Sequence, residues 1–135
     1  MTTPNSAAAT VAILATDTPA RFVTLDLTGE GNLDLFRAQS DELAAIGTFT
    51  LVPARGDIDL WADDEALLTT DPRVNLVAST LAGTPLFGAI VATGGDDETG
   101  NTVGLTPTQI NTITHANQTV YPEHTIYPNL LNHLL

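Results

Sequence analysis

The chain has 135 residues, with 16 aspartates and glutamates against four arginines, no lysine and no cysteine. Its net charge of −12 repels phosphate, so we expect no direct binding to nucleic acid or to an anionic membrane surface. The absence of cysteine excludes disulfides and thiolate metal sites, and no apolar run approaches the roughly 20 residues of a membrane-spanning helix.

Two strands and a helix are predicted for the first third of the chain. Residues 1–10 are small and polar and indicate a disordered N-terminus. The apolar run over 11–16 predicts a buried strand, and the alternation over 21–27 predicts a strand with one solvated face. The apolar spacing over 33–46 is that of a helix, and Gly47 follows it where a C-terminal glycine cap belongs.

A hairpin, a second helix and a central strand are predicted next. Residues 49–53 and 57–61 are short extended runs joined by a turn, which is typical of a β-hairpin. Asp71 precedes a proline and predicts a helix over 72–82, with Asp71 as its N-cap. The long apolar run over 85–93 is the best candidate for the centre of the sheet.

The last part of the chain predicts one further helix and a tail. Thr106 and Gln109 have the spacing of a capping box, which predicts a helix over 107–116. Residues 117–135 contain two Tyr-Pro pairs and predict an irregular tail with a short amphipathic end. The element order ββαββαβα predicts a single α+β domain over 11–116, with a small mixed or antiparallel sheet of about five strands and three short helices.

The candidate catalytic and metal motifs each lack an essential part. The segment 29–31 follows a strand but lacks the third glycine of a dinucleotide-binding fingerprint. His115, His124 and His133 are nine residues apart, whereas metal ligation on a helix needs spacings of three or four. The acids of 96–98 are consecutive and do not alternate as calcium ligands do. We therefore predict no catalytic residue, cofactor or metal, and a protein that is not an enzyme.

The acidic residues are concentrated in one stretch, since six of the 16 fall between residues 57 and 71. A protein with this charge is expected to bind a basic protein partner. Two alternatives remain open: a DNA mimic that inhibits a nucleic-acid enzyme, and a small enzyme that uses the strand carboxylates Asp57 and Asp59. The acids expected at the protein-binding surface are Asp57, Asp59, Asp63, Asp64, Glu65 and Asp71.

Two further features are candidates for the same surface. Asn75 is a polar residue on a predicted helix, where it either satisfies strand-edge backbone groups or lines a ligand site. Leu131, Leu134 and Leu135 have the spacing of a helix that docks in a groove, although such ends also pack onto their own domain. The sequence leaves the oligomeric state open.

Three segments carry a family resemblance: Leu60–Glu65, Asn75–Ala78, and Leu86–Gly95 with its continuation into Val103–Thr106. Through them, residues 57–113 resemble a family catalogued as domain of unknown function 3846. Its members occur in actinobacteria, their plasmids and their phages. The resemblance implies a mobile-element or phage setting in a GC-rich bacterium and carries over no activity. Together with the acidic charge, this setting leads us to expect a phage- or plasmid-type accessory protein that engages a basic host protein. Because the start of the chain lacks the pattern of a signal peptide, we expect it in the cytoplasm of the bacterial host.

Overall fold

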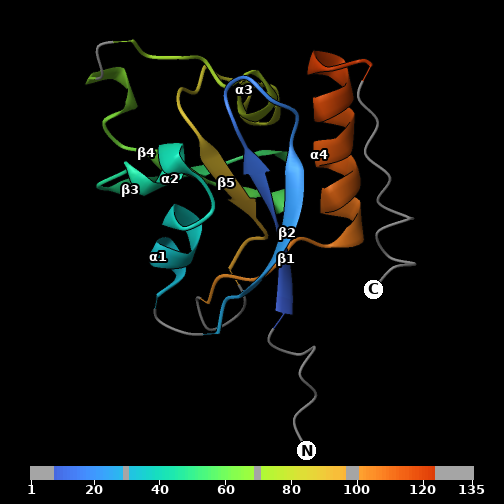
Figure 1. The fold of residues 1–135 in the computed structure, drawn as a ribbon. Helices are drawn as coiled ribbons and strands as arrows, with labels where there is room; N and C mark the ends of the chain where they lie inside the picture. Colours follow the sequence, from blue (N-terminus) through green and yellow to red (C-terminus); the bar gives the residue numbers. More distant parts are fainter. Residues whose placement is uncertain (1–7, 29–30, 69–70, 97–100, 124–135) are drawn as a thin grey trace, which may run out of the picture.

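A five-stranded antiparallel sheet organises the protein in this computed structural model, which describes residues 8–28, 31–68, 71–96 and 101–123. The strand order is β2-β1-β5-β4-β3 (Figure 1). The sheet and its helices confirm the predicted α+β class. The strands are β1 (Ala8–Leu14), β2 (Arg21–Asp26), β3 (Phe49–Pro53), β4 (Asp59–Asp63) and β5 (Ile90–Thr93), and the helices are α1 (Asn32–Arg37), α2 (Asp41–Ala44), α3 (Leu76–Ala82) and α4 (Pro107–Val120).

Helices cover both faces of the sheet, and each face has its own apolar core. On one face, α3 and α4 pack against residues that include Leu14 and Leu60. On the other face, α1 and α2 bury Phe36 and Leu43 against the sheet. Figure 1 shows the pair α1 and α2 well apart from α3 and α4. Because successive residues of β1 alternate between the two cores, this strand is apolar on both sides, which accounts for its continuous apolar run.

The predicted central strand is confirmed, because β5 lies between β1 and β4 and all its residues are buried. It is shorter than predicted and begins at Ile90, not at residue 85. Phe87 forms an isolated bridge with Val74, and Gly88 adopts a left-handed φ of +82°. This turn redirects the chain, so regular pairing with β1 and β4 begins only after it.

The predicted helix over 33–46 is two helices in the structure. The break lies at Ser40, whose extended backbone places it as the N-cap of α2. Its hydroxyl oxygen accepts a 3.1 Å hydrogen bond from the backbone N–H of Leu43. Helix α2 then ends at Ala44 with Ala45 as its C-cap, so the predicted glycine cap at Gly47 is wrong. A serine that competes for the backbone in this way starts a new helix more readily than it continues an old one.

The N-cap of α3 is Asn75, and the predicted cap at Asp71 is wrong. Before Asn75 the chain is extended: the backbone N–H of Asn75 donates to the carbonyl of Leu86, and the N–H of Gly88 donates to the carbonyl of Arg73. These long-range bonds hold the chain out of a helix until Leu76, because they occupy the backbone beside the start of β5.

The predicted end of α3 and the predicted start of α4 are confirmed. Helix α3 ends at Gly83 with a left-handed φ of +73°. The capping box of α4 is complete, with the Gln109 N–H donating to the Thr106 hydroxyl at 3.2 Å and the Thr106 N–H donating to Oε1 of Gln109 at 2.9 Å. The helix runs to Val120, four residues further than predicted.

The ends of the described chain are more regular than the sequence predicts. Strand β1 begins at Ala8, so residues 8–10 are paired with β2 and do not belong to a disordered terminus. Similarly, residues 117–120 belong to α4 and not to an irregular tail. Within the described residues, no helix is both long and apolar enough to cross a membrane.

Candidate functional site

The predicted hairpin is confirmed and carries three of the six candidate acids. Strands β3 and β4 pair from Phe49 opposite Asp63 to Pro53 opposite Asp59. Their connection is a short 3₁₀ turn, Arg55–Asp57, which places β4 two residues later than the predicted strand.

The turn of the hairpin has an unusual backbone that is held from outside. Gly56 and Asp57 have φ values of +69° and +60°, a region that aspartate tolerates better than most side chains. The side-chain amide of Gln109 donates to the carbonyls of Gly56 at 3.0 Å and Asp57 at 3.2 Å. Helix α4 therefore holds the backbone of the turn at Gly56 and Asp57.

Three carboxylates gather at this turn end. Asp57, Asp59 and Asp96 line a pocket of about 380 Å³ together with Gln109. Partial burial raises the pKa of the Asp59 carboxyl above its ordinary value, and the negative charges of Asp96 and Asp57 raise it further. The pocket therefore holds negative charge at an energetic cost to the free protein.

The wall of this pocket is backbone, because two glycines allow close approach. A β-carbon at Gly94 would overlap the carbonyl oxygen of Gly104. A β-carbon at Gly104 would lie 2.8 Å from the Cβ of Ala9. The approach is fixed by hydrogen bonds from the N–H of Gly94 to the carbonyl of Val103 and from the N–H of Leu105 to the carbonyl of Thr10. Gly94 and Gly104 thus bring two backbone segments into close contact at this side of the pocket.

The remaining candidate acids lie at the other end of β4. Asp63 and Asp71 line a second hollow of about 350 Å³, beside Glu42 and Arg73. Arg73 lies 3.7 Å from a carboxylate oxygen of Asp71 and also 3.7 Å from one of Asp17, in exposed ion pairs. This end is therefore partly neutralised, unlike the turn end.

The exposed turn after β4 completes this second group. The N–H of Glu65 donates to a carboxylate oxygen of Asp63 at 2.9 Å, and Asp64 lies between them at the surface. Asp59 and Asp63 are separated by the length of β4, about 13 Å at the usual rise of a strand. The acids are adjacent in sequence, but the structure places them in two groups at opposite ends of the hairpin.

An apolar pair that the sequence analysis did not single out lies between the two groups. Leu51 is 43% exposed and lies opposite Trp61 in the hairpin. The indole N–H of Trp61 donates to the hydroxyl of Thr93 at 2.9 Å, and its ring lies 5.6 Å from that of Phe36. The alternation Asp59, Trp61, Asp63 was the available signal, since it puts all three side chains on one face of the strand.

The four arginines interact with groups other than the carboxylates of Asp57, Asp59 and Asp96. Arg21 and Arg55 donate to the backbone carbonyls of Gln39 and Thr80. Arg37 donates to the carbonyls of Ile46 and Gly47, forms an ion pair with Asp34 and lies over the ring of Phe49. Arg73 faces Asp17 and Asp71. Among the described residues, no ion pair reaches the carboxylates at the turn end, which are Asp57, Asp59 and Asp96.

Asn75 has a structural role and does not lie on the candidate binding surface. Its side chain is fully buried. Its amide nitrogen donates to the carbonyls of Leu14 at 2.8 Å and Gly88 at 2.9 Å, and its oxygen accepts from the N–H of Ala78 at 3.1 Å. Asn75 therefore joins α3 to the end of β1 and to the approach to β5, and offers no atom to a partner.

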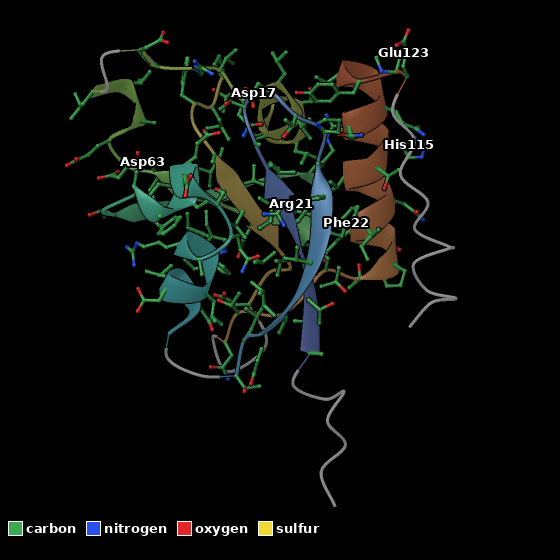
Figure 2. The ribbon with its side chains drawn as sticks, viewed as in Figure 1. Asp17, Arg21, Phe22, Asp63, His115 and Glu123 are labelled. Atoms are coloured by element: carbon green, nitrogen blue, oxygen red, sulfur yellow. The ribbon has the colours of Figure 1, made fainter. Side chains whose placement is uncertain are left out.

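Several other candidates from the sequence lie outside the described residues. These include Leu131, Leu134 and Leu135, two of the three histidines, and the acids at 97–98. His115 lies exposed on α4, on the opposite side of the molecule from Asp63 (Figure 2). In the part of the chain that the structure describes, no three histidines or carboxylates are grouped as metal ligands would be.

Comparison with known proteins gives one result. The model of a family described as Domain of unknown function (DUF3846) matches residues 39–118, more than half of the chain. The match begins before α2 and covers the hairpin, α3, β5 and most of α4. Neither the curated proteins nor the solved structures contain a match. The candidate surface on the hairpin lies entirely within the matched segment.

Proposed function

We propose a function for this chain, which belongs to the DUF3846 family: it is a non-catalytic acidic binding module that engages a basic protein through its β3–β4 hairpin. The observation that carries the proposal is the group of carboxylates at the turn end. Asp57, Asp59 and Asp96 share one pocket, and no described arginine pairs with them.

The electrostatics of this group favour a cationic partner. Partial burial raises the pKa of the Asp59 carboxyl, and repulsion from the charges of Asp96 and Asp57 raises it further. A guanidinium or ammonium group placed among them removes that repulsion and adds charge-assisted hydrogen bonds. This repulsion is already present in the free protein. Its removal on binding therefore contributes to the binding free energy.

The charge of the whole protein acts in the same direction. A net charge of −12 attracts a basic partner over distances comparable to the Debye length, about 8 Å at physiological ionic strength. This field raises the association rate and orients the encounter before contact. Specific contact is then left to the hairpin, where negative charge and exposed apolar surface occur together.

The biological setting of the proposal rests on the family resemblance. That resemblance implies a plasmid or phage setting, in which a basic partner inside the cell would be a host protein. We therefore propose that this chain is a phage- or plasmid-type accessory protein of the host cytoplasm.

Binding of a labelled arginine-rich peptide across a salt series tests the proposal. The test variant is Asp57→Asn with Asp59→Asn, since asparagine also tolerates the left-handed φ at position 57. The matched control is Asp26→Asn with Glu123→Gln, which removes the same charge from exposed sites on β2 and after α4. Asparagine at position 26 keeps an oxygen for the bond with Thr28.

We expect the wild-type affinity to fall steadily with salt. The hairpin variant should weaken binding by about five- to thirtyfold at low salt, from two charge pairs of roughly 0.5–1 kcal/mol each. The control should change affinity by less than about twofold. Equal weakening by both variants would show that only net charge matters and would contradict a binding role for the hairpin.

A further inference from the structure

Strand β3 forms an open edge of the sheet. In the described part of the chain it pairs with β4 alone. Two hydrogen bonds at the ends of the hairpin show which residues of β3 face β4. The N–H of Asp64 donates to the carbonyl of Thr48, and the N–H of Ala54 donates to the carbonyl of Ile58. In an antiparallel ladder such hydrogen-bonded pairs alternate with pairs that do not bond. The residues of β3 that bond to β4 are therefore Thr50 and Val52.

The other residues of β3 point their backbone groups away from the sheet. Phe49 and Leu51 each present one N–H and one C=O outward, and Pro53 presents one C=O. No other described group bonds to them. Figure 1 shows β3 at the outer margin of the molecule, with no strand beyond it. This arrangement can accept an additional antiparallel or parallel strand.

Apart from Pro53, the edge lacks the protection that sheet edges usually carry. Native edges are commonly blocked by charged residues, bulges or a covering segment. The opposite edge strand β2 begins at Arg21 and ends at Asp26. In contrast, β3 has the sequence Phe-Thr-Leu-Val-Pro with no charged residue, and only Pro53 limits its length. The part of this edge before Pro53 is therefore a template for strand addition.

The side chains at this edge favour a specific partner strand. Leu51 and Trp61 form a pair without hydrogen bonds between them, the type in which the side chains approach most closely. An apolar side chain on an added strand would extend this pair and cover Leu51. Tryptophan is prominent among the residues that dominate binding energy at protein interfaces.

The charges around β3 select the chemistry of the partner. Asp59 lies opposite Pro53 and Asp63 lies opposite Phe49, so a carboxylate stands one strand behind each end of the edge. A second copy of this chain would bring another net charge of −12 to the same place, and repulsion disfavours it. A strand with arginine or lysine toward the Pro53 end can reach across β3 to Asp59, whereas at the other end the guanidinium of Arg37 already lies over the ring of Phe49.

We infer that β3 is the docking edge of this protein, onto which an extended, arginine- or lysine-rich segment of a protein partner adds as a further strand. The inference rests on the proposed function and specifies how the basic partner binds. Main-chain hydrogen bonds to Phe49 and Leu51 supply affinity, and the apolar and acidic side chains supply specificity.

The test uses a short peptide in which arginine alternates with threonine, and a copy N-methylated throughout its central residues. N-methylation removes the donors from both edges of the peptide and keeps every charge. The protein variant is Leu51→Pro, which removes an outward N–H without touching the ladder to β4. Its control is Thr24→Pro on β2: Thr24 lies opposite Thr10, whose carbonyl bonds to Leu105, so the N–H of Thr24 also points outward.

Hydrogen exchange supplies a readout that needs no variant. In the free protein the amides of Phe49 and Leu51 should exchange rapidly, and the peptide should slow exchange at both. We expect N-methylation and Leu51→Pro each to weaken binding by about tenfold or more, from one or two lost hydrogen bonds. Thr24→Pro should stay within about twofold of the wild type. If Leu51→Pro does not fold, the exchange data and the two peptides still decide the question.

The outcomes separate this inference from the proposed function. Equal binding of both peptides, with unchanged exchange at Leu51, overturns strand addition, while the proposed function stands if Asp57→Asn with Asp59→Asn still weakens that binding. No binding of either peptide at low salt overturns both. A dimer in sedimentation, with the Leu51 amide protected before any peptide is added, overturns the choice of a basic partner in favour of a second copy.

Discussion

Replacement of Asn75 by alanine tests the packing that positions β5 and α3. The buried amide makes three hydrogen bonds, to the carbonyls of Leu14 and Gly88 and from the N–H of Ala78. Loss of an N-cap costs about 1 kcal/mol. Each of the two carbonyl bonds adds about 1 kcal/mol, because the carbonyls are left without a donor in the interior.

The free energy of unfolding should therefore fall by about 3 kcal/mol in Asn75→Ala. For a domain of this size each 1 kcal/mol lowers Tm by roughly 3–5 °C, so the expected shift is roughly 10–15 °C. Calorimetry and urea denaturation both measure this loss. Thr80→Ala is the matched control on the same helix, because its exposed hydroxyl bonds only to the carbonyl of Leu76. If the two variants melted within about 3 °C of each other, the hydrogen bonds of Asn75 would not stabilise the fold as we infer.

Three further substitutions test other parts of the structure. Thr106→Ala should lower the free energy of unfolding by about 1 kcal/mol in urea denaturation, since it breaks the capping box of α4, and an unchanged midpoint would contradict that role. The raised pKa of Asp59 means that its ionisation destabilises the fold, so Asp59→Asn should be more stable than the wild type at neutral pH. That difference should disappear as the pH falls below the raised pKa, and a difference that persisted at low pH would point to a cause other than charge. Neutralising Asp63, Asp64 and Glu65 together should slow association with a basic ligand roughly threefold in stopped-flow measurements and leave stability nearly unchanged, and an unchanged rate across a salt series would remove this end of the hairpin from the binding surface.

Local signals in the sequence identified the elements whose causes are local. The capping box at Thr106, the glycine that ends α3 and the hairpin around Gly56 all depend on residues close together in the chain. The family resemblance also agrees with the matched segment. Such features are predictable because a few neighbouring residues determine them.

Boundaries that depend on distant residues could not be predicted in this way. Helix α3 begins at Leu76 because the preceding chain bonds to Leu86 and Gly88, and nothing near Asp71 indicates those bonds. The arrangement in space of the acids between residues 57 and 71 could not be predicted either. Its members are neighbours in sequence, but an extended strand separates Asp59 from Asp63 by about 13 Å. Asp96 comes from another part of the chain. Its position beside Asp57 and Asp59 shows that the turn end of the hairpin is the one where carboxylates gather without a paired arginine.

An NMR titration of isotope-labelled protein with the arginine–threonine peptide tests the central claim most directly, because every backbone amide reports separately. Our account predicts shift changes concentrated in residues 49–65, largest near Leu51 and Asp59, that shrink as salt is added. Changes concentrated on α3 or α4, or changes of equal size over the whole acidic surface, would contradict the assignment of the β3–β4 hairpin as the binding site.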